Sequence, residues 1–381
     1  MKKIVVSSNT SWSVFNFRLE LINYLAAKGY SVEIISPNDS YSDKLRDLGF
    51  VVHTIKMASS NISPFTDLVS IFQYVAILRR IKPDYYLGFT AKPNIYGGYI
   101  AALLGSRVVN NIAGLGRTFS NKGVLQSVMQ FMYRIGLSKS YHVFFQNKDD
   151  LALFENNGLL GKGTHSILPG SGVNTHRFIP RSSECHMISF KSQAVSGSLK
   201  AKFTFLFSAR LLLEKGIREY INAARDICRD FQDVKFKVLG KHTGSAAEIP
   251  MQELDKACSE GVIEYLGITD DVVSVLHGVD CFVLPSYYRE GVPRSLLEAG
   301  SCALPLITTD SVGCRETVID GINGFLVMPQ DYVSLRDAIK KMLSLSKDDV
   351  MLMGEASRKY MMANFSEALV FERYERILQV E

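Results

Sequence analysis

The chain has 381 residues, a net charge of +5, and hydrophobic side chains at 47% of its positions. This length allows two domains that each bury a full core. No apolar run approaches the roughly 18 residues that span a bilayer, and no cysteine or histidine spacing is typical of a metal site. The composition thus argues against a membrane-spanning protein, a disulfide scaffold and a zinc module, and we expect a cytoplasmic protein without a bound metal.

The charge is unevenly distributed along the chain. Residues 1–150 contain 17 Lys and Arg against 9 Asp and Glu, a net charge of +8, whereas the remainder has a net charge of −3. A basic first part suits an anionic partner, either a phosphate-bearing substrate or a membrane surface, and solvated helix faces explain the charge equally well. We expect no nucleic-acid partner.

The first half of the chain alternates short apolar runs with helical patterns. This spacing predicts right-handed crossovers and a parallel, Rossmann-like sheet. A single helix is expected over residues 14–27, and for Arg18 on it a surface position is the more ordinary interpretation. Strands are expected at 3–8, 31–36, 51–55 and 84–88, and an amphipathic helix is expected at 64–80.

Two loops that follow strands contain candidate ligand-binding residues. The first, Thr90–Gly97, contains Lys92, and the second contains Gly114, Gly116 and Arg117. The glycines permit positive φ and close backbone approach to a ligand, while the two cations supply charge for a diphosphate. Two glycines in a loop, however, more often form only a turn.

Residues 124–134 are strongly apolar and have basic flanks. A helix with Met, Phe and Tyr on one face and basic residues around it can lie in a membrane interface. A core or domain-packing helix is the more ordinary interpretation of the same pattern.

The second half begins with a buried strand, 203–210, that ends in Arg210. Lys215 and Gly216 follow at the start of a helix. Two cations at a strand's carboxyl end and the next helix N-terminus can hold a diphosphate. Solvated loop cations are the alternative.

A further apolar strand, 279–284, stops at Pro285, and a helix is expected from Arg294, with Pro293 near its first turn. Loops at the carboxyl ends of parallel strands are where open α/β sheets bind ligands, and a helix N-terminus there favours an anion. Glu290 in the loop and Glu298 in the helix would repel phosphates, so they suit hydroxyls further along the ligand. The combination indicates a nucleotide sugar, while two solvated carboxylates remain the alternative.

Several of these segments together resemble a known family. Glu290 and Glu298 enclose seven residues that include Gly291, Val292 and Pro293, which is similar to the E-x7-E signature of retaining GT-B glycosyltransferases of family 4, also called glycosyltransferase group 1. Arg210 and Lys215 resemble the family's R-x4-K-G pair. The segments Thr90–Gly97 and Gly114–Gly116 resemble bacterial enzymes that build O-antigen, capsule and polyprenyl-diphosphate-linked oligosaccharides. Asn9–Ser13 departs from the family's Gly-Gly loop, which weakens any phosphate role for that loop.

The resemblance implies an α/β architecture of the GT-B type, with two doubly wound Rossmann-like domains facing a central cleft. It places an acceptor domain at 1–175, a linker at 176–200, a nucleotide-sugar domain at 201–362 and a C-terminal helix, 363–381, that crosses back to the first domain.

The same resemblance implies retaining transfer of a hexose or N-acetylhexosamine from a UDP-sugar to a polyprenyl-diphosphate-linked saccharide, without a metal cofactor, at the cytoplasmic face of the inner membrane. It assigns the diphosphate and catalysis to Arg210 and Lys215, donor-sugar hydroxyls and catalysis to Glu290, and the ribose to Glu298. Acceptor contacts fall to Lys92, Gly114, Gly116 and Arg117, and Gly291, Val292 and Pro293 line the donor site. A GDP-sugar transferase, a nucleotide-sugar epimerase and a non-enzymatic sugar-nucleotide-binding protein are the alternatives.

Overall fold

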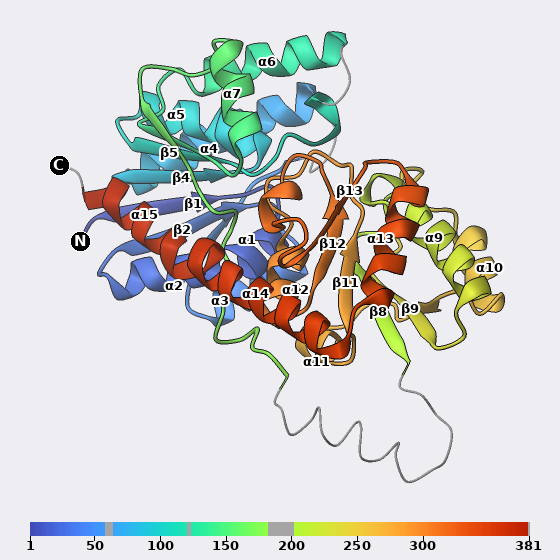
Figure 1. Cartoon of the computed structure of the whole chain (residues 1–381). Coiled ribbons are helices and arrows are strands. Elements are labelled where there is room, and N and C mark those ends of the chain that lie inside the picture. Colours follow the sequence, from blue (N-terminus) through green and yellow to red (C-terminus); the bar gives the residue numbers. More distant parts are fainter. Residues whose placement is uncertain (58–63, 120–122, 182–201, 380–381) are drawn as a thin grey trace. The chain divides into compact units, whose positions relative to one another are not determined.

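The computed structural model describes residues 1–57, 64–119, 123–181 and 202–379. The chain divides into two compact units, unit 1 (Met1–Ser171 with Glu367–Glu381) and unit 2 (Gly172–Ser366). Each unit contains one all-parallel sheet between helices (Figure 1). The prediction of an α/β chain with two doubly wound Rossmann-like domains is confirmed.

The sheet of unit 1 has seven strands in the order β3-β2-β1-β4-β5-β6-β7. The direction of the strand order reverses between β1 and β4, the position at which doubly wound sheets open a crevice. Its strands are β1 (Lys3–Ser7), β2 (Ser31–Ser36), β3 (Val51–Thr54), β4 (Tyr85–Phe89), β5 (Arg107–Ile112), β6 (His142–Phe145) and β7 (Thr164–Ile167). Its helices are α1 (Ser11–Phe17), α2 (Leu19–Ala27), α3 (Ser40–Asp47), α4 (Pro64–Ile81), the π-turn η1 (Pro93–Gly97), α5 (Gly98–Leu103), the 3-10 turn η2 (Gly116–Phe119), α6 (Val124–Gly136), α7 (Lys148–Asn156) and α15 (Glu367–Gln379).

Both faces of this sheet are buried, which explains why its strands are apolar without alternation. On β1, Ile4 and Val6 pack against α1, α2, α3 and α15, while Val5 packs against α4 and α5 on the opposite face. On β6, Phe144 faces the first layer and Val143 and Phe145 face α6 and α7. The helices α4 to α7 therefore share one face of the sheet.

Unit 2 has six strands in the order β10-β9-β8-β11-β12-β13, and its order reverses between β8 and β11. The strands are β8 (Phe203–Ser208), β9 (Val234–Leu239), β10 (Glu264–Tyr265), β11 (Cys281–Leu284), β12 (Leu306–Thr309) and β13 (Gly324–Val327). The helices are η3 (Leu213–Lys215), α9 (Ile217–Asp230), α10 (Met251–Ser259), α11 (Val272–His277), α12 (Arg294–Ser301), η4 (Arg315–Thr317), α13 (Tyr332–Ser344) and α14 (Lys347–Phe365). One continuous apolar core holds them together.

Two local predictions are wrong. The helix expected over 14–27 is two helices, because the backbone of Arg18 leaves the helical region (φ −128°, ψ −8°) between α1 and α2. The segment expected as a loop at Thr90–Gly97 coils into a helical turn after Thr90, whose φ is +68°. Most of the linker expected at 176–200 lies outside the described residues.

Candidate functional site

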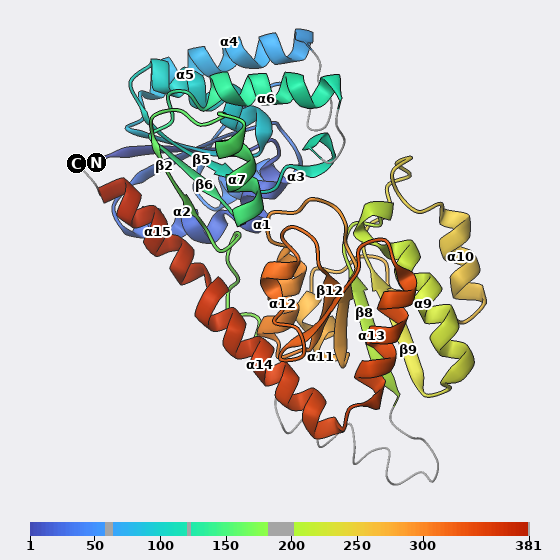
Figure 2. The same ribbon diagram turned by 45° about the horizontal axis from the view of Figure 1, so that its top comes forward.

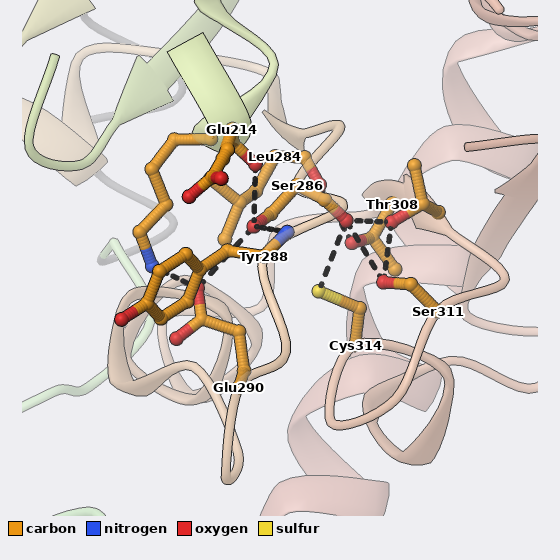
Figure 3. A network of polar contacts seen from close by, with 10 residues as sticks. Glu214, Leu284, Ser286, Tyr288, Glu290, Thr308, Ser311 and Cys314 are labelled. Carbon is orange, nitrogen blue, oxygen red and sulfur yellow. Dashed lines mark hydrogen bonds and ion pairs between the residues drawn. The ribbon is translucent and has the colours of Figure 1, made fainter. Parts of the chain in front are cut away.

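The candidate donor site lies in unit 2, at the edge of the sheet where the carboxyl ends of β8 and β11 meet. Because these strands are neighbours, the loop that follows β8 and the loop that follows β11 lie together. There Lys215 donates through Nζ to Oε1 of Glu290, and Ser286 Oγ lies 3.3 Å from the same oxygen (Figure 3). The topology thus brings together residues 75 positions apart at the reversal point of the strand order.

Hydrogen bonds fix the loop that carries Glu290 on both sides. The backbone N–H groups of Tyr287 and Tyr288 donate to the carbonyl of Glu214 (3.0 Å each). On the other side, the carbonyl oxygen of Ser286 accepts from the hydroxyl of Ser311 (2.8 Å) and from that of Thr309 (Figure 3). The loop is therefore held rigidly before any ligand arrives, as preorganised electrostatic stabilisation requires.

Two glycines allow the loops to approach so closely. Gly216, with φ +79°, would place a Cβ 2.1 Å from the carbonyl oxygen of Pro285. Gly313, with φ +86°, would place one 2.2 Å from the carbonyl oxygen of Gly291. Both positions need glycine for the left-handed backbone and for the space.

Lys215 is buried, and its ammonium also lies 4.9 Å from the centre of the Tyr288 ring. Burial lowers the pKa of Lys215 to about 7, and the nearby charge of Arg210 acts in the same direction. The Glu290 carboxylate in contact with it favours the charged form. Arg210 itself is exposed just beyond the end of β8. A cation pair thus lies beside one carboxylate, which suits a ligand with an anionic and a hydroxylated part.

Glu298 lies on α12, which starts after Pro293 as the sequence predicts. Its Oε1 accepts from Nε of Arg294 (2.9 Å), one turn earlier. Burial raises the pKa of Glu298, while Arg294 and Arg177 lower it. The side chain of Glu298 is 17% exposed, so a ligand hydroxyl can still reach it. It is not the freely solvated carboxylate of the alternative interpretation. Gly291 and Val292, next to Pro293, are buried in the same loop.

The residues expected to bind an acceptor lie in unit 1 and are only partly brought together. Gly114 (φ +97°) lines a cavity of about 160 Å³, with Thr90, Ala113, Phe119 and other residues from β5, η1 and α6. Gly116 also has a positive φ, of +58°, but does not line this cavity. The side chain of Arg117 lies outside the described residues.

Lys92 points toward a structural partner. Its Nζ lies 2.6 Å from Oδ1 of Asp67, a buried carboxylate on α4, and Tyr96 donates to the other carboxylate oxygen (3.3 Å). Both partners of the ion pair are mostly buried, and removal of one would leave the other charge uncompensated. The geometry gives Lys92 a role in holding the segment after β4 against α4.

Two features of unit 1 were missed by sequence reasoning. Arg18, expected at the surface, is buried with its guanidinium 4.2 Å from the centre of the Phe89 ring. A network of buried amides joins η1, β5 and the residue after β6: Asn94 donates to the carbonyl of Asn111 (2.8 Å), and Gln146 donates to the side-chain oxygen of Asn111 (3.2 Å). The consecutive Asn110 and Asn111 near the end of an apolar strand are the sequence feature from which this network could have been predicted.

Two candidate features do not occur in the described part of the chain. Across residues 1–57, 64–119, 123–181 and 202–379, no cluster of His, Cys, Asp or Glu is arranged to hold a metal ion. None of the helices described combines the length and apolarity that crossing a membrane requires.

Comparison with known sequences identifies the family. The family described as "Glycosyl transferase 4-like" matches residues 3–147, and that described as "Glycosyl transferases group 1" matches residues 189–360. A Campylobacter jejuni protein named N,N'-diacetylbacillosaminyl-diphospho-undecaprenol alpha-1,3-N-acetylgalactosaminyltransferase is 26% identical over 96% of each chain. The capsular polysaccharide biosynthesis glycosyltransferase CapM of Staphylococcus aureus is 25% identical over 93% of this chain and 91% of its own.

Solved structures share the fold across the whole chain. A glycosyltransferase from Rickettsia africae aligns with a TM-score of 0.78 at 20% identity, covering 100% of this chain and 99% of its own. Anabaena HepE in complex with UDP aligns with a TM-score of 0.77 at 16% identity, covering 99% of each. Together with the family matches to both halves, these findings show that the chain is an enzyme of the group 1, family 4-like glycosyltransferases, built on the GT-B fold.

Proposed function

We propose that this glycosyltransferase moves a hexose or an N-acetylhexosamine from a UDP-sugar to a polyprenyl-diphosphate-linked saccharide, with retention at the anomeric carbon. The observation that carries the donor half of the proposal is the contact of Lys215 with Glu290, beside Arg210, at the reversal point of unit 2. The acceptor half is supported by the names of the C. jejuni relative and of an Escherichia coli relative, 23% identical over 73% of this chain, which is named as a galactosyltransferase acting on GlcNAc-diphosphoundecaprenol.

In the proposed donor complex, the diphosphate competes with Glu290 for Lys215. The Lys215 ammonium and the exposed Arg210 guanidinium bind the diphosphate oxygens, and the N–H groups at the start of α12 add positive potential. Glu290, then shared with or released from Lys215, accepts hydrogen bonds from hydroxyls of the sugar. Glu298, in the second turn of α12, accepts them from the ribose. The proposal needs no metal ion, because these groups supply the positive charge.

The reaction needs most stabilisation where charge grows, at the departing diphosphate. Each preorganised cation there is worth about 3 kcal/mol of barrier by analogy with oxyanion holes. We place the acceptor hydroxyl on the same face of the sugar as the diphosphate. Its oxygen bonds to the anomeric carbon as the carbon–phosphate oxygen bond breaks, and a phosphate oxygen takes its proton. A glycosyl-enzyme adduct trapped with a slow substrate would contradict this route.

A thermal-shift panel without added metal tests the donor assignment. UDP and UDP-sugars are expected to raise Tm, whereas GDP and ADP are not. At a hundredfold excess over Kd, the bound ligand adds about 2.7 kcal/mol to the free energy of unfolding. Arg210→Ala should abolish this shift. Lys235→Ala, an exposed lysine near the start of β9, is the matched control and should retain it. A selective response to GDP would replace UDP in the proposal.

The acceptor assignment needs a transfer assay with a short-chain polyprenyl-diphosphate saccharide. Appearance of one added sugar, with the anomeric configuration of the donor by NMR, would support retaining transfer. Turnover of the donor into a second nucleotide sugar without acceptor would instead identify an epimerase.

A further inference from the structure

Helix α4 carries an apolar stripe on its outer face. Phe65, Leu68 and Phe72 follow one another at helical spacing, and Phe65 and Phe72 are 80% and 65% exposed. The same stripe ends in basic residues, because Arg79 and Arg80 are exposed at the C-terminus of the helix. The opposite face holds Tyr74 and Leu78 in the core, so the outer stripe is not needed for folding.

Helix α6 repeats the pattern. Its residues Val124, Val128, Phe131 and Ile135 form one exposed stripe, in which Val124 is 82% and Phe131 61% exposed. Met129, Met132 and Tyr133 on the other side pack into the core, so the helix is apolar on both sides. Monomeric soluble proteins seldom expose a contiguous apolar surface of this kind.

The two stripes belong to one side of unit 1. Both helices pack against α5 and η1, and Figure 2 shows them running beside each other. In a parallel α/β sheet, each helix starts at the edge where the strands end, so the N-terminal ends of both stripes lie toward the edge that holds the cavity. Met129 and Tyr133 of α6 line that cavity, which places it one helix thickness, about 10 Å, from the exposed stripe.

The charge of this region is strongly positive. Residues 64–139 contain nine Lys and Arg against two Asp and no Glu. Five of these cations are exposed at or just after the C-terminal ends of α4 and α6: Arg79, Arg80, Lys82, Arg134 and Lys139. Asp67 is buried against Lys92, and Asp84 accepts from the backbone N–H of Lys3 (2.6 Å). Within the described residues, the outer faces of α4 and α6 therefore carry no carboxylate.

We infer that the outer faces of α4 and α6 form a membrane-docking surface that inserts its apolar stripes into an anionic lipid leaflet. Apolar side chains with basic residues at the helix ends are what an interfacial helix needs. A second copy of the chain is a poorer occupant, because a two-fold contact would bring two basic surfaces together. The role of this surface in the reaction rests on the proposed function, because a lipid-linked acceptor would enter the cavity from the adjoining bilayer.

Sedimentation of the full-length protein with vesicles tests this surface. Phosphatidylcholine vesicles containing phosphatidylglycerol should bind the protein, and pure phosphatidylcholine vesicles should bind it much less. The double variant Phe72→Ser/Phe131→Ser should weaken binding by about tenfold or more, because two aromatic side chains no longer enter the lipid. Leu352→Ser, an exposed apolar residue of α14 in unit 2, is the matched control and should bind like the wild type. Circular dichroism confirms folding of each variant.

A second measurement separates insertion from adsorption. The wild type has one tryptophan, Trp12 on α1, whereas Phe131→Trp adds one on the proposed surface. Brominated lipids should quench the added fluorescence and leave that of Trp12 unchanged. Absence of binding to anionic vesicles, or binding that the double variant retains, would overturn the inference. A wild-type dimer that the double variant dissociates would assign the surface to a second copy instead. Transfer to a water-soluble acceptor tests the proposed function separately, because it does not need the bilayer.

Discussion

The two reversal points of the molecule are built in opposite ways. In unit 2, charged side chains meet at the ends of β8 and β11, on loops joined by backbone hydrogen bonds and glycines. In unit 1, the loops after β1 and β4 meet where the backbone N–H of Asn9 donates to Thr90 Oγ1 (3.3 Å). The surroundings there are amides, a strained Thr90 and a small cavity.

This difference indicates what each edge can recognise. Cations held in place serve a ligand whose charge is fixed, such as a diphosphate. Amides and a partly apolar cavity serve uncharged hydroxyls and ring faces, and they permit different sugars. Changes to unit 2 should therefore reduce the rate strongly, whereas changes to the cavity of unit 1 should mainly alter which acceptor is used and how tightly.

The largest effect is expected at Lys215. Lys215→Met keeps most of the length of the side chain but removes its charge, and transfer should fall about 100-fold to 1000-fold, the usual loss for one preorganised donor. The variant should also lose stability, because the mostly buried Glu290 loses its ion pair with Lys215. Steady-state transfer and thermal unfolding measure the two effects.

A double variant separates these two roles. Lys215→Met/Glu290→Gln removes both charges, so Tm should recover toward the wild type while transfer stays low. If transfer recovers together with Tm, Lys215 serves only to hold the loop.

The next largest effect is expected from the glycine that closes the donor loop. Gly313→Ala adds a Cβ at positive φ against the carbonyl of Gly291, and should destabilise the protein by about 2–4 kcal/mol through strain and overpacking. Gly321, with φ +76° and no heavy atom within 4 Å of a built Cβ, is the matched control. Gly321→Ala should cost only about 1–2 kcal/mol, from the backbone alone. Equal losses in chemical denaturation would show that the close contact contributes nothing.

The pH dependence of UDP binding should reveal the coupling between Lys215 and Glu290. In the wild type, burial and the charge of Arg210 lower the pKa of Lys215 to about 7, so Lys215 is mostly neutral at pH 9. UDP favours the protonated form, so binding must take up a proton above pH 7, and affinity should fall by up to about tenfold per pH unit between pH 7 and 9. In Glu290→Gln, loss of the carboxylate in contact with Lys215 should lower its pKa further, so the fall in affinity should begin at a lower pH. Calorimetry in two buffers measures affinity and proton uptake, and an identical pH dependence in the two proteins would refute the coupling.

Much of the fold and the charged part of the donor site could be predicted from the sequence. Apolar strands that end in Pro285 or Arg210, followed by helix starts, identify sheet edges by local chemistry alone. Ion pairs could not be predicted, because they join distant positions: the sequence suggests Lys215 and Lys92 as free cations, whereas the structure places each against a carboxylate.

Unit 1 was less predictable for a related reason. Arg18 is predicted to lie at the surface, because nothing near it in the chain indicates that it will pack against Phe89. The cavity is formed by single residues from β5, η1 and α6, and no short motif contains them. Sites built from uncharged groups in several elements leave little signal in the local sequence.

The smallest effect, and the one that best isolates unit 1, is expected from filling its cavity. Ala113 lines the cavity and is exposed at its mouth, so a larger side chain can enter the space without disturbing the core. Ala113→Leu should raise the KM for the lipid-linked acceptor by about tenfold, the cost of one or two misplaced methylene groups, and leave kcat and the UDP-induced rise in Tm unchanged. Ala27→Leu, at the exposed end of α2, is the control and should change none of them. A loss of the UDP response in Ala113→Leu would mean that the residues around this cavity serve the donor. It would contradict the assignment of the donor to unit 2 and of the acceptor to unit 1.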